Sequence, residues 1–92
     1  MVVTWSKRAS KSYLKTLESI LEKWTVKEGE AFMDEVDSYI NNLSKNKMLC
    51  PPSKKINLRK CVVSKQTSLI YKVYGKKISI VVFIDNKSNH KY

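Results

Sequence analysis

The sequence is poor in cysteine, histidine and acidic residues, and each shortage excludes a class of protein. The two cysteines, Cys50 and Cys61, are too few for a disulfide framework, and we expect both to be reduced thiols. A single histidine and the lack of paired cysteine spacing argue against a metal site, so we expect neither a metal nor a cofactor. No apolar run approaches the ~20 residues that a membrane span needs, and residues 1–8 lack the apolar stretch of a signal peptide. These absences predict a cytoplasmic protein with no membrane partner.

Positive charge is what the sequence has in excess. Lysine and arginine number 18 against 8 acidic residues, which leaves a formal net charge of +10. A charge so far from zero favours nucleic acid, the ribosome or an acidic protein as partner, and a solvated basic surface without a partner is the alternative. The length suffices for one small domain, residues 1–92, in which two layers of secondary structure enclose one core.

Residues 57–85 predict three consecutive strands, because β-branched and aromatic residues alternate along this stretch. Gly75 occupies the first central position of a two-residue turn between the last two strands, which suits a type II′ hairpin. This turn would place Tyr71 opposite Ile80 and Leu69 opposite Val82. The residues expected on the apolar face, toward the helices, are Leu58, Val62, Leu69, Tyr71, Val73, Ile78, Ile80 and Val82.

The other face of these strands is expected to be cationic and half apolar. Arg59 would lie opposite Lys72, in one row with Ser79. The remaining positions on this face are Cys61, Ile70, Val81 and Phe83. Because the first face is needed for the core, we expect function on this second face.

The first half of the chain predicts a short strand and two helices. Residues 2–5 form a β-prone run, and Ser6 can cap the helix that follows. Apolar residues spaced by three and four mark one helical stripe over residues 13–24 and another over residues 32–43. Thr25 begins a capping box at the start of the second helix. The predicted fold is α+β in the order β-α-α-β-β-β, an antiparallel twisted sheet with a helical hairpin packed on one face.

This order of elements resembles the RelE/ParE superfamily of toxins from type II toxin–antitoxin systems, which includes plasmid stabilisation system proteins. The resemblance covers nearly the whole chain, and most of the positions that carry it are core positions. They are residues 3–6, Ala9, residues 31–32, Ile40, Leu43, residues 58–59, residues 70–73, residues 78–80 and residues 83–86. The segment after the last strand resembles an Asp-x-Arg-Gln-Asn-Pro type of tail, with Lys87 in place of the arginine and His90 in place of the proline.

The resemblance implies a toxin of one of two kinds. One branch of the family cleaves mRNA in the ribosomal A site, and the other inhibits DNA gyrase by binding. The first would make this chain a metal-independent endoribonuclease. A third possibility, from a different class, is a non-toxic basic domain that binds RNA or the ribosome.

RNA cleavage by attack of a 2′-hydroxyl needs a base, cations for the charged phosphorane, and an acid for the leaving 5′-oxygen. By resemblance, Arg59 matches the second-strand arginine of the mRNA-cleaving branch, and Lys87 stands where that branch has another arginine. His90 is the acid–base candidate because its pKa is ordinarily near neutrality, and Tyr92 could stack on an unpaired base. The lysines expected to bind RNA phosphates are Lys54, Lys55 and Lys72.

A toxin of this family also needs an antitoxin. We expect an acidic, partly disordered antitoxin to fold onto an apolar patch formed by Ile70, Val81 and Phe83. The same patch would serve a gyrase inhibitor. The expected partners are therefore an antitoxin together with the ribosome and mRNA, or with DNA gyrase.

Overall fold

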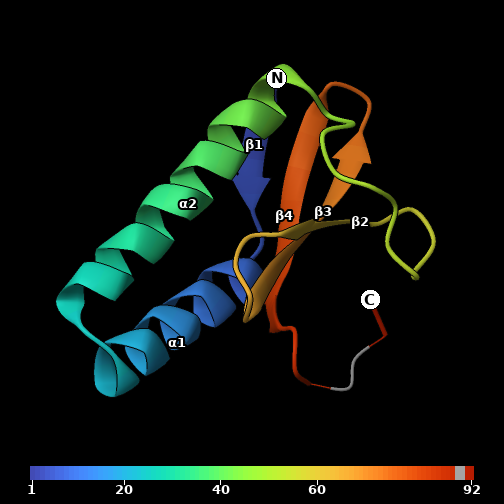
Figure 1. Ribbon diagram of the computed structural model, residues 1–92. Helices are drawn as coiled ribbons and strands as arrows, with labels where there is room; N and C mark the ends of the chain where they lie inside the picture. The colour runs from blue at the N-terminus through green and yellow to red at the C-terminus, as the bar shows by residue number, and fades with distance from the viewer. Residues whose placement is uncertain (89–90) are drawn as a thin grey trace.

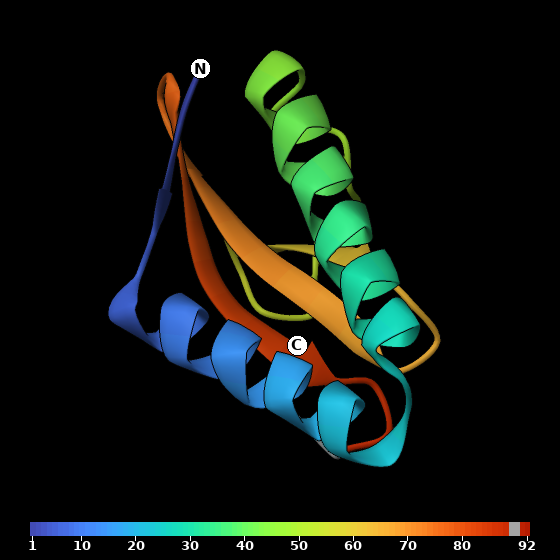
Figure 2. The same ribbon diagram turned by 90° about the vertical axis from the view of Figure 1, so that its left-hand side faces the viewer.

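The computed structural model describes residues 1–88 and 91–92. The elements along the chain are β1 (Val2–Trp5), α1 (Lys7–Lys23), α2 (Val26–Lys45), β2 (Arg59–Val62), β3 (Thr67–Tyr74) and β4 (Lys77–Asp85). Both helices lie on one side of a four-stranded sheet and diverge from their junction (Figures 1 and 2). The prediction of an α+β fold with a helical hairpin on one face is confirmed. The sheet face away from the helices is called the open face below.

The strand order is β1-β4-β3-β2. The last three strands form the predicted antiparallel meander, whereas β1 joins the sheet beside β4 in the parallel direction. A parallel neighbour requires a long crossover, and the two helices are part of that crossover. Within the described residues, no helix combines the length and apolarity needed to cross a bilayer.

Both helices begin at the caps that the sequence predicts. The Ser6 hydroxyl accepts a hydrogen bond from the backbone N–H of Ala9 at 2.9 Å. The Thr25 hydroxyl accepts one from the backbone N–H of Glu28 at 3.2 Å. Each cap satisfies a backbone donor that has no partner inside its helix, so these starting points are decided locally.

The β3–β4 hairpin follows the predicted register near its turn and departs from it farther away. Gly75 has φ +54 while Lys76 has no positive φ, as a type II′ turn requires, and Tyr71 pairs with Ile80. Beyond this pair a β-bulge shifts the register, so that Leu69 lies opposite Phe83 rather than opposite Val82. The expected pairing of Leu69 with Val82 is therefore wrong.

The bulge sits where β1 ends against β4. Ser6 donates its backbone N–H to the carbonyl of Ile80 at 3.0 Å and its hydroxyl to the carbonyl of Val81 at 2.7 Å. Val81 is the extra residue, and strict alternation of side chains fails there. Phe83 consequently faces the helices, and Val82 faces the opposite side.

β2 is shifted by one residue from the predicted register. Val62 pairs with Ser68 and Arg59 with Tyr71, because Val63 belongs to the connection and donates its N–H to the Thr67 carbonyl at 3.0 Å. A slip of one residue moves every side chain of a strand to the other face. Val62 is thus 58 % exposed instead of buried, and Arg59 lies on the helix side rather than opposite Lys72.

Two apolar clusters result, one on each face of the sheet. The cluster under the helices contains Ala9, Phe32, Val36, Leu43, Cys50, Cys61, Val63, Leu69, Tyr71, Ile78, Ile80 and Phe83. The smaller open-face cluster contains Ile70, Val82 and Tyr92, with half-buried Leu58, Val81 and Ile84 packed against it. Leu58 and Val82, predicted to face the helices, belong to the second cluster, whereas Cys61 and Phe83 belong to the first.

Candidate nucleic-acid interface

Tyr92 occupies the centre of the open face. Its side chain is only 9 % exposed and packs with Ile70 and Val82. Figure 1 shows this end of the chain beside the loop that connects α2 to β2. The apolar side chains on this face offer Tyr92 a place to bury its ring.

Two segments of the chain, the start of α1 and the α2–β2 loop, contact Tyr92 through basic residues. Arg8, in the first turn of α1, donates from Nη1 to the Tyr92 hydroxyl at 3.2 Å. Lys55, in the α2–β2 loop, has its Nζ 5.5 Å from the centre of the Tyr92 ring, within the range of a cation–π contact. The backbone N–H of Lys54 donates to the Tyr92 carbonyl at 3.4 Å. The Arg8 guanidinium and the Lys55 ammonium are groups that suit a phosphate. The Tyr92 ring is itself packed against Ile70 and Val82, so little of its surface is open to the unpaired base that it was predicted to stack on.

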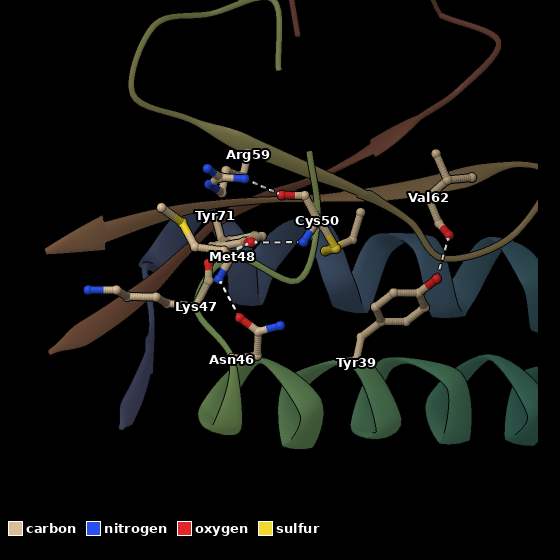
Figure 3. The surroundings of a disulfide bond; sticks show 9 residues. Tyr39, Asn46, Lys47, Met48, Cys50, Arg59, Val62 and Tyr71 are labelled. Atoms are coloured by element: carbon tan, nitrogen blue, oxygen red, sulfur yellow. Dashed lines mark hydrogen bonds between the residues drawn. A yellow bond between two sulfur atoms is a disulfide. The ribbon is translucent and has the colours of Figure 1, made fainter. Parts of the chain in front are cut away.

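A disulfide and a buried tyrosine hold the α2–β2 loop in place (Figure 3). Cys50 and Cys61 are bonded, with their Cα atoms 5.3 Å apart, so the prediction of two free thiols is wrong. Their pairing depends on β2 lying beside the loop, which the sequence spacing does not reveal. The Tyr71 hydroxyl donates to the Lys47 carbonyl at 2.9 Å and accepts from the Cys50 N–H at 3.2 Å. Desolvation by burial raises the pKa of Tyr71, against smaller opposing effects of the Cys50 hydrogen bond and Arg59, and so keeps this hydroxyl neutral.

Arg59 lies apart from the cations around Tyr92. It pairs with Tyr71 on the helix side of β2, and its Nη1 donates to the carbonyl of Cys50 (Figure 3). The guanidinium therefore supports the loop that carries Lys54 and Lys55. Sequence reasoning had grouped Arg59 with Lys72, and the shifted register of β2 separates them.

The other predicted RNA-binding residues are spread around the site. Lys72 lies on the open face, opposite Ser79, with its Nζ 4.6 Å from the centre of the Tyr74 ring. Lys87 is exposed just after β4. His90 lies outside the described residues. Of the seven predicted RNA-site residues, Lys54, Lys55 and Tyr92 are brought together.

The predicted antitoxin patch does not form as one exposed surface. Ile70 is fully buried on the open face beneath Tyr92, while Phe83 is 4 % exposed and packs under the helices. Val81, at the bulge, is half-buried. The reason is the bulge in β4, which places Ile70 and Phe83 on opposite faces.

Arg8 is the residue of this cluster that sequence reasoning missed. Arg8 sits in the first turn of α1, where a basic residue is ordinarily interpreted as part of the solvated surface. In the sequence, 84 positions separate it from Tyr92. One signal was present, since Arg8 and Arg59 are the two arginines of the chain. Another is that no acidic residue occurs between Asp37 and Asp85, so Asp85, at the end of β4, is the one acidic residue in the second half of the sequence.

Titratable groups suited to a metal are sparse. Among the residues that the structure describes, no group of three or more histidine, cysteine, aspartate or glutamate side chains is placed to hold an ion.

No family model and no curated protein matches the sequence. Solved structures do match its fold. A chain of the chromosomal ParDE TA system from P. aeruginosa superposes with a TM-score of 0.77 at 16 % identity, covering 92 % of this chain and 95 % of that one. The YoeB/ParE toxin from Agrobacterium tumefaciens gives 0.70 at 12 % identity, covering 94 % and 99 %.

A YoeB-YefM complex from Staphylococcus aureus also contains a similar chain, with a TM-score of 0.61 at 14 % identity, covering 91 % of this chain and 94 % of that one. The likeness in all three extends over nearly the full length of both chains, although few residues are identical. This chain therefore has the fold of the RelE/ParE-like toxins.

Proposed function

We propose that the protein is the toxin of a type II toxin–antitoxin module and that it inhibits growth by cleaving mRNA on the ribosome. The fold supports the toxin role. The observation that favours RNA as the target is the cluster of Arg8, Lys54 and Lys55 around Tyr92 on the open face. A net charge of +10 agrees with an anionic substrate.

The proposed reaction is an internal transfer within RNA. The 2′-oxygen forms a bond to the adjacent phosphorus and the bond to the 5′-oxygen breaks, leaving a 2′,3′-cyclic phosphate and a 5′-hydroxyl. One proton leaves the 2′-hydroxyl and one reaches the 5′-oxygen. Arg8 and the two lysines would stabilise the extra negative charge of the phosphorane, which ordinarily contributes most to such catalysis. Lys87 and His90 remain proposed contributors to phosphate binding and proton transfer.

An acidic antitoxin is the partner we propose in the resting state. A YoeB-YefM complex is among the structurally similar proteins, which supports a protein partner for this chain. Exposed apolar side chains gather at the α1–α2 junction, where Leu21, Trp24 and Val26 are 45 %, 55 % and 67 % exposed. They offer apolar anchors for such a partner in place of the buried Ile70 and Phe83.

The test is induced expression in a bacterial host with mapping of mRNA 5′ ends, run beside a supercoiling assay with purified gyrase. We expect growth arrest and new 5′ ends within translated mRNA while supercoiling continues. Inhibited supercoiling without new 5′ ends would replace this proposal with gyrase inhibition. Unimpaired growth would leave a non-toxic RNA- or ribosome-binding domain.

A pair of arginine variants separates catalysis from support of the loop. Arg8→Lys keeps the charge and removes the planar fork. Losing a transition-state contact of ~3 kcal/mol would slow cleavage on the order of a hundredfold without lowering the melting temperature. Arg59→Lys is the matched variant, and we expect it to lower the melting temperature more than the cleavage rate. The reverse ranking would restore Arg59 as the phosphate ligand that the sequence predicts.

A further inference from the structure

A groove runs along α1 from the neighbourhood of Tyr92 to the end of β4. Its first section has a volume of about 480 Å³ and is lined by Lys7, Arg8, Lys11, Lys15 and Val82. Arg8 bonds the Tyr92 hydroxyl and Val82 packs with Tyr92, so this section opens directly beside the candidate site.

The second section continues from Ser12 and Lys15, which line both. It has a volume of about 610 Å³ and ends between Lys23 on α1 and Lys87 after β4. Because a helix rises 1.5 Å per residue, the path from residue 7 to residue 23 is about 24 Å long. It is long enough for several nucleotides of an extended strand.

The charges along this groove are almost all positive. Among the residues that the structure describes, six cations line its two sections, namely Lys7, Arg8, Lys11, Lys15, Lys23 and Lys87, against one carboxylate, Asp85. The acidic residues of α1, Glu18 and Glu22, do not line it. No ion pair with a described carboxylate engages Lys11 or Lys15.

We propose that this groove along α1 binds the phosphate backbone of the single-stranded RNA that flanks the nucleotide at Tyr92. Lys11 and Lys15 each contact one phosphate, and the strand leaves the site toward Lys23 and Lys87. This inference rests on the proposed action on RNA and adds to it where the substrate runs.

RNA fits the groove better than an acidic protein segment does. A peptide that folds onto a surface needs several apolar anchors, and of the exposed large apolar side chains in the described part of the chain only Trp24 lines the groove, at its far end. Along its middle the groove instead presents the hydroxyl group of Ser19 between Lys15 and Lys23, whereas the hydroxyls of Ser12 and Thr16 donate to backbone carbonyls of α1. Hydroxyl and ammonium groups are the usual contacts of a phosphate backbone.

The test is binding of a fluorescent 2′-O-methyl oligoribonucleotide, which cannot be cleaved, measured by anisotropy across a salt series. The variant is Lys11→Ala with Lys15→Ala, and the matched control is Lys27→Ala with Lys45→Ala, two exposed lysines of α2 outside the groove. Two lost phosphate contacts should flatten the slope of log K against log salt by about 1.4 and weaken binding about 25-fold at 0.1 M salt. The control should change by less than about threefold, because bulk charge is screened.

Equal losses in the two double variants would overturn the inference, because the lysines would then act through net charge alone. If the groove variant instead lost binding to polyglutamate and kept its RNA affinity, an acidic protein would be the occupant. Failure of the unmutated protein to bind RNA at any salt would overturn the proposed function as well. RNA binding by the unmutated protein with no effect of the groove variant would overturn the groove alone.

Discussion

Leu69 and Ile70 are neighbours on β3, both fully buried, and they are buried by very different parts of the molecule. Leu69 faces the helices and lies in a cluster of twelve buried residues that α1, α2 and the sheet build together. Ile70 faces the other way, and the fully or nearly buried residues it meets are Val82 and Tyr92. One face is closed by two regular helices, and the other by a returning segment and a loop.

The difference separates stability from recognition. Helices that pack on a sheet bury a continuous apolar face, which supplies most of the free energy of folding. The open face has a small apolar centre ringed by Arg8, Lys54, Lys55 and Lys72. Charged side chains on the open face can change, and a ligand can bind there, with little effect on the free energy of folding. We therefore expect function to be concentrated on this face.

The difference between the two faces can be tested most directly by truncating the two neighbouring side chains on β3, Leu69 and Ile70. We expect Leu69→Ala to lower the free energy of unfolding by about 4 kcal/mol, since the tightly packed helix side cannot close the cavity. Ile70→Ala should cost about 2 kcal/mol, because the Tyr92 segment can move toward the space that is left. Urea denaturation measures both. Equal losses would mean that the open face is packed as rigidly as the helix side.

The disulfide ties a loop of the open face to β2, so reducing it tests how much the two faces depend on each other. Residues 50 and 61 are separated by 11 positions. Closing a loop of this size stabilises by about 3 kcal/mol through the entropy of the unfolded chain. We expect Cys50→Ser with Cys61→Ser to lose that amount in thermal or urea unfolding. No change on adding a reductant to the unmutated protein would contradict this role for the disulfide.

The buried hydroxyl of Tyr71 connects the helix side to the same loop. Tyr71→Phe leaves the Cys50 N–H without its acceptor, and should cost about 1–2 kcal/mol at neutral pH. Urea denaturation measures this loss. If Tyr71→Phe unfolds at the same urea concentration as the unmutated protein, the hydroxyl does not stabilise the loop.

Tyr71 and Tyr13 should also make the helix side sensitive to alkali. Burial raises the pKa of both above the ordinary value of 10.0, with Asp37 adding to the rise at Tyr13. The folded state then holds these protons more tightly than the unfolded state, so stability is fully present below about pH 10 and falls as the pH rises above it. Tyr71→Phe should make this fall shallower. A pH series of melting temperatures with the same slope in both proteins would refute it.

The smallest expected effect concerns the open face. Tyr92→Phe removes the hydrogen bond from Arg8 and keeps the apolar ring on Ile70. Because Arg8 is exposed and can turn to water, the cost should be below about 1 kcal/mol. If urea denaturation shows a loss as large as that of Ile70→Ala, the hydroxyl rather than the ring holds this segment in place.

Local chemistry in the sequence was enough to define the elements and the fold class. The caps at Ser6 and Thr25, the turn at Gly75 and the strand at residues 2–5 are each specified by residues within a few positions of one another. The family resemblance, rather than local chemistry, grouped Lys54, Lys55 and Tyr92, and it grouped Arg59 with them although the structure places Arg59 on the other face of the sheet.

Tertiary structure alone decided which side chains share a face and which cations share a site. The bulge at Val81 depends on contacts with the end of β1. The one-residue shift of β2 depends on where the β2–β3 connection begins. The alternation of side chains within a strand predicts neither of them. The Cys50–Cys61 bond depends on that shift, since Cys61 must face the helix side to meet Cys50. Arg8 and Tyr92 lie near opposite ends of the sequence, and the packing of α1 against β4 contributes to bringing them together. Such a contact is set by the path of the backbone and not by neighbouring residues in the sequence.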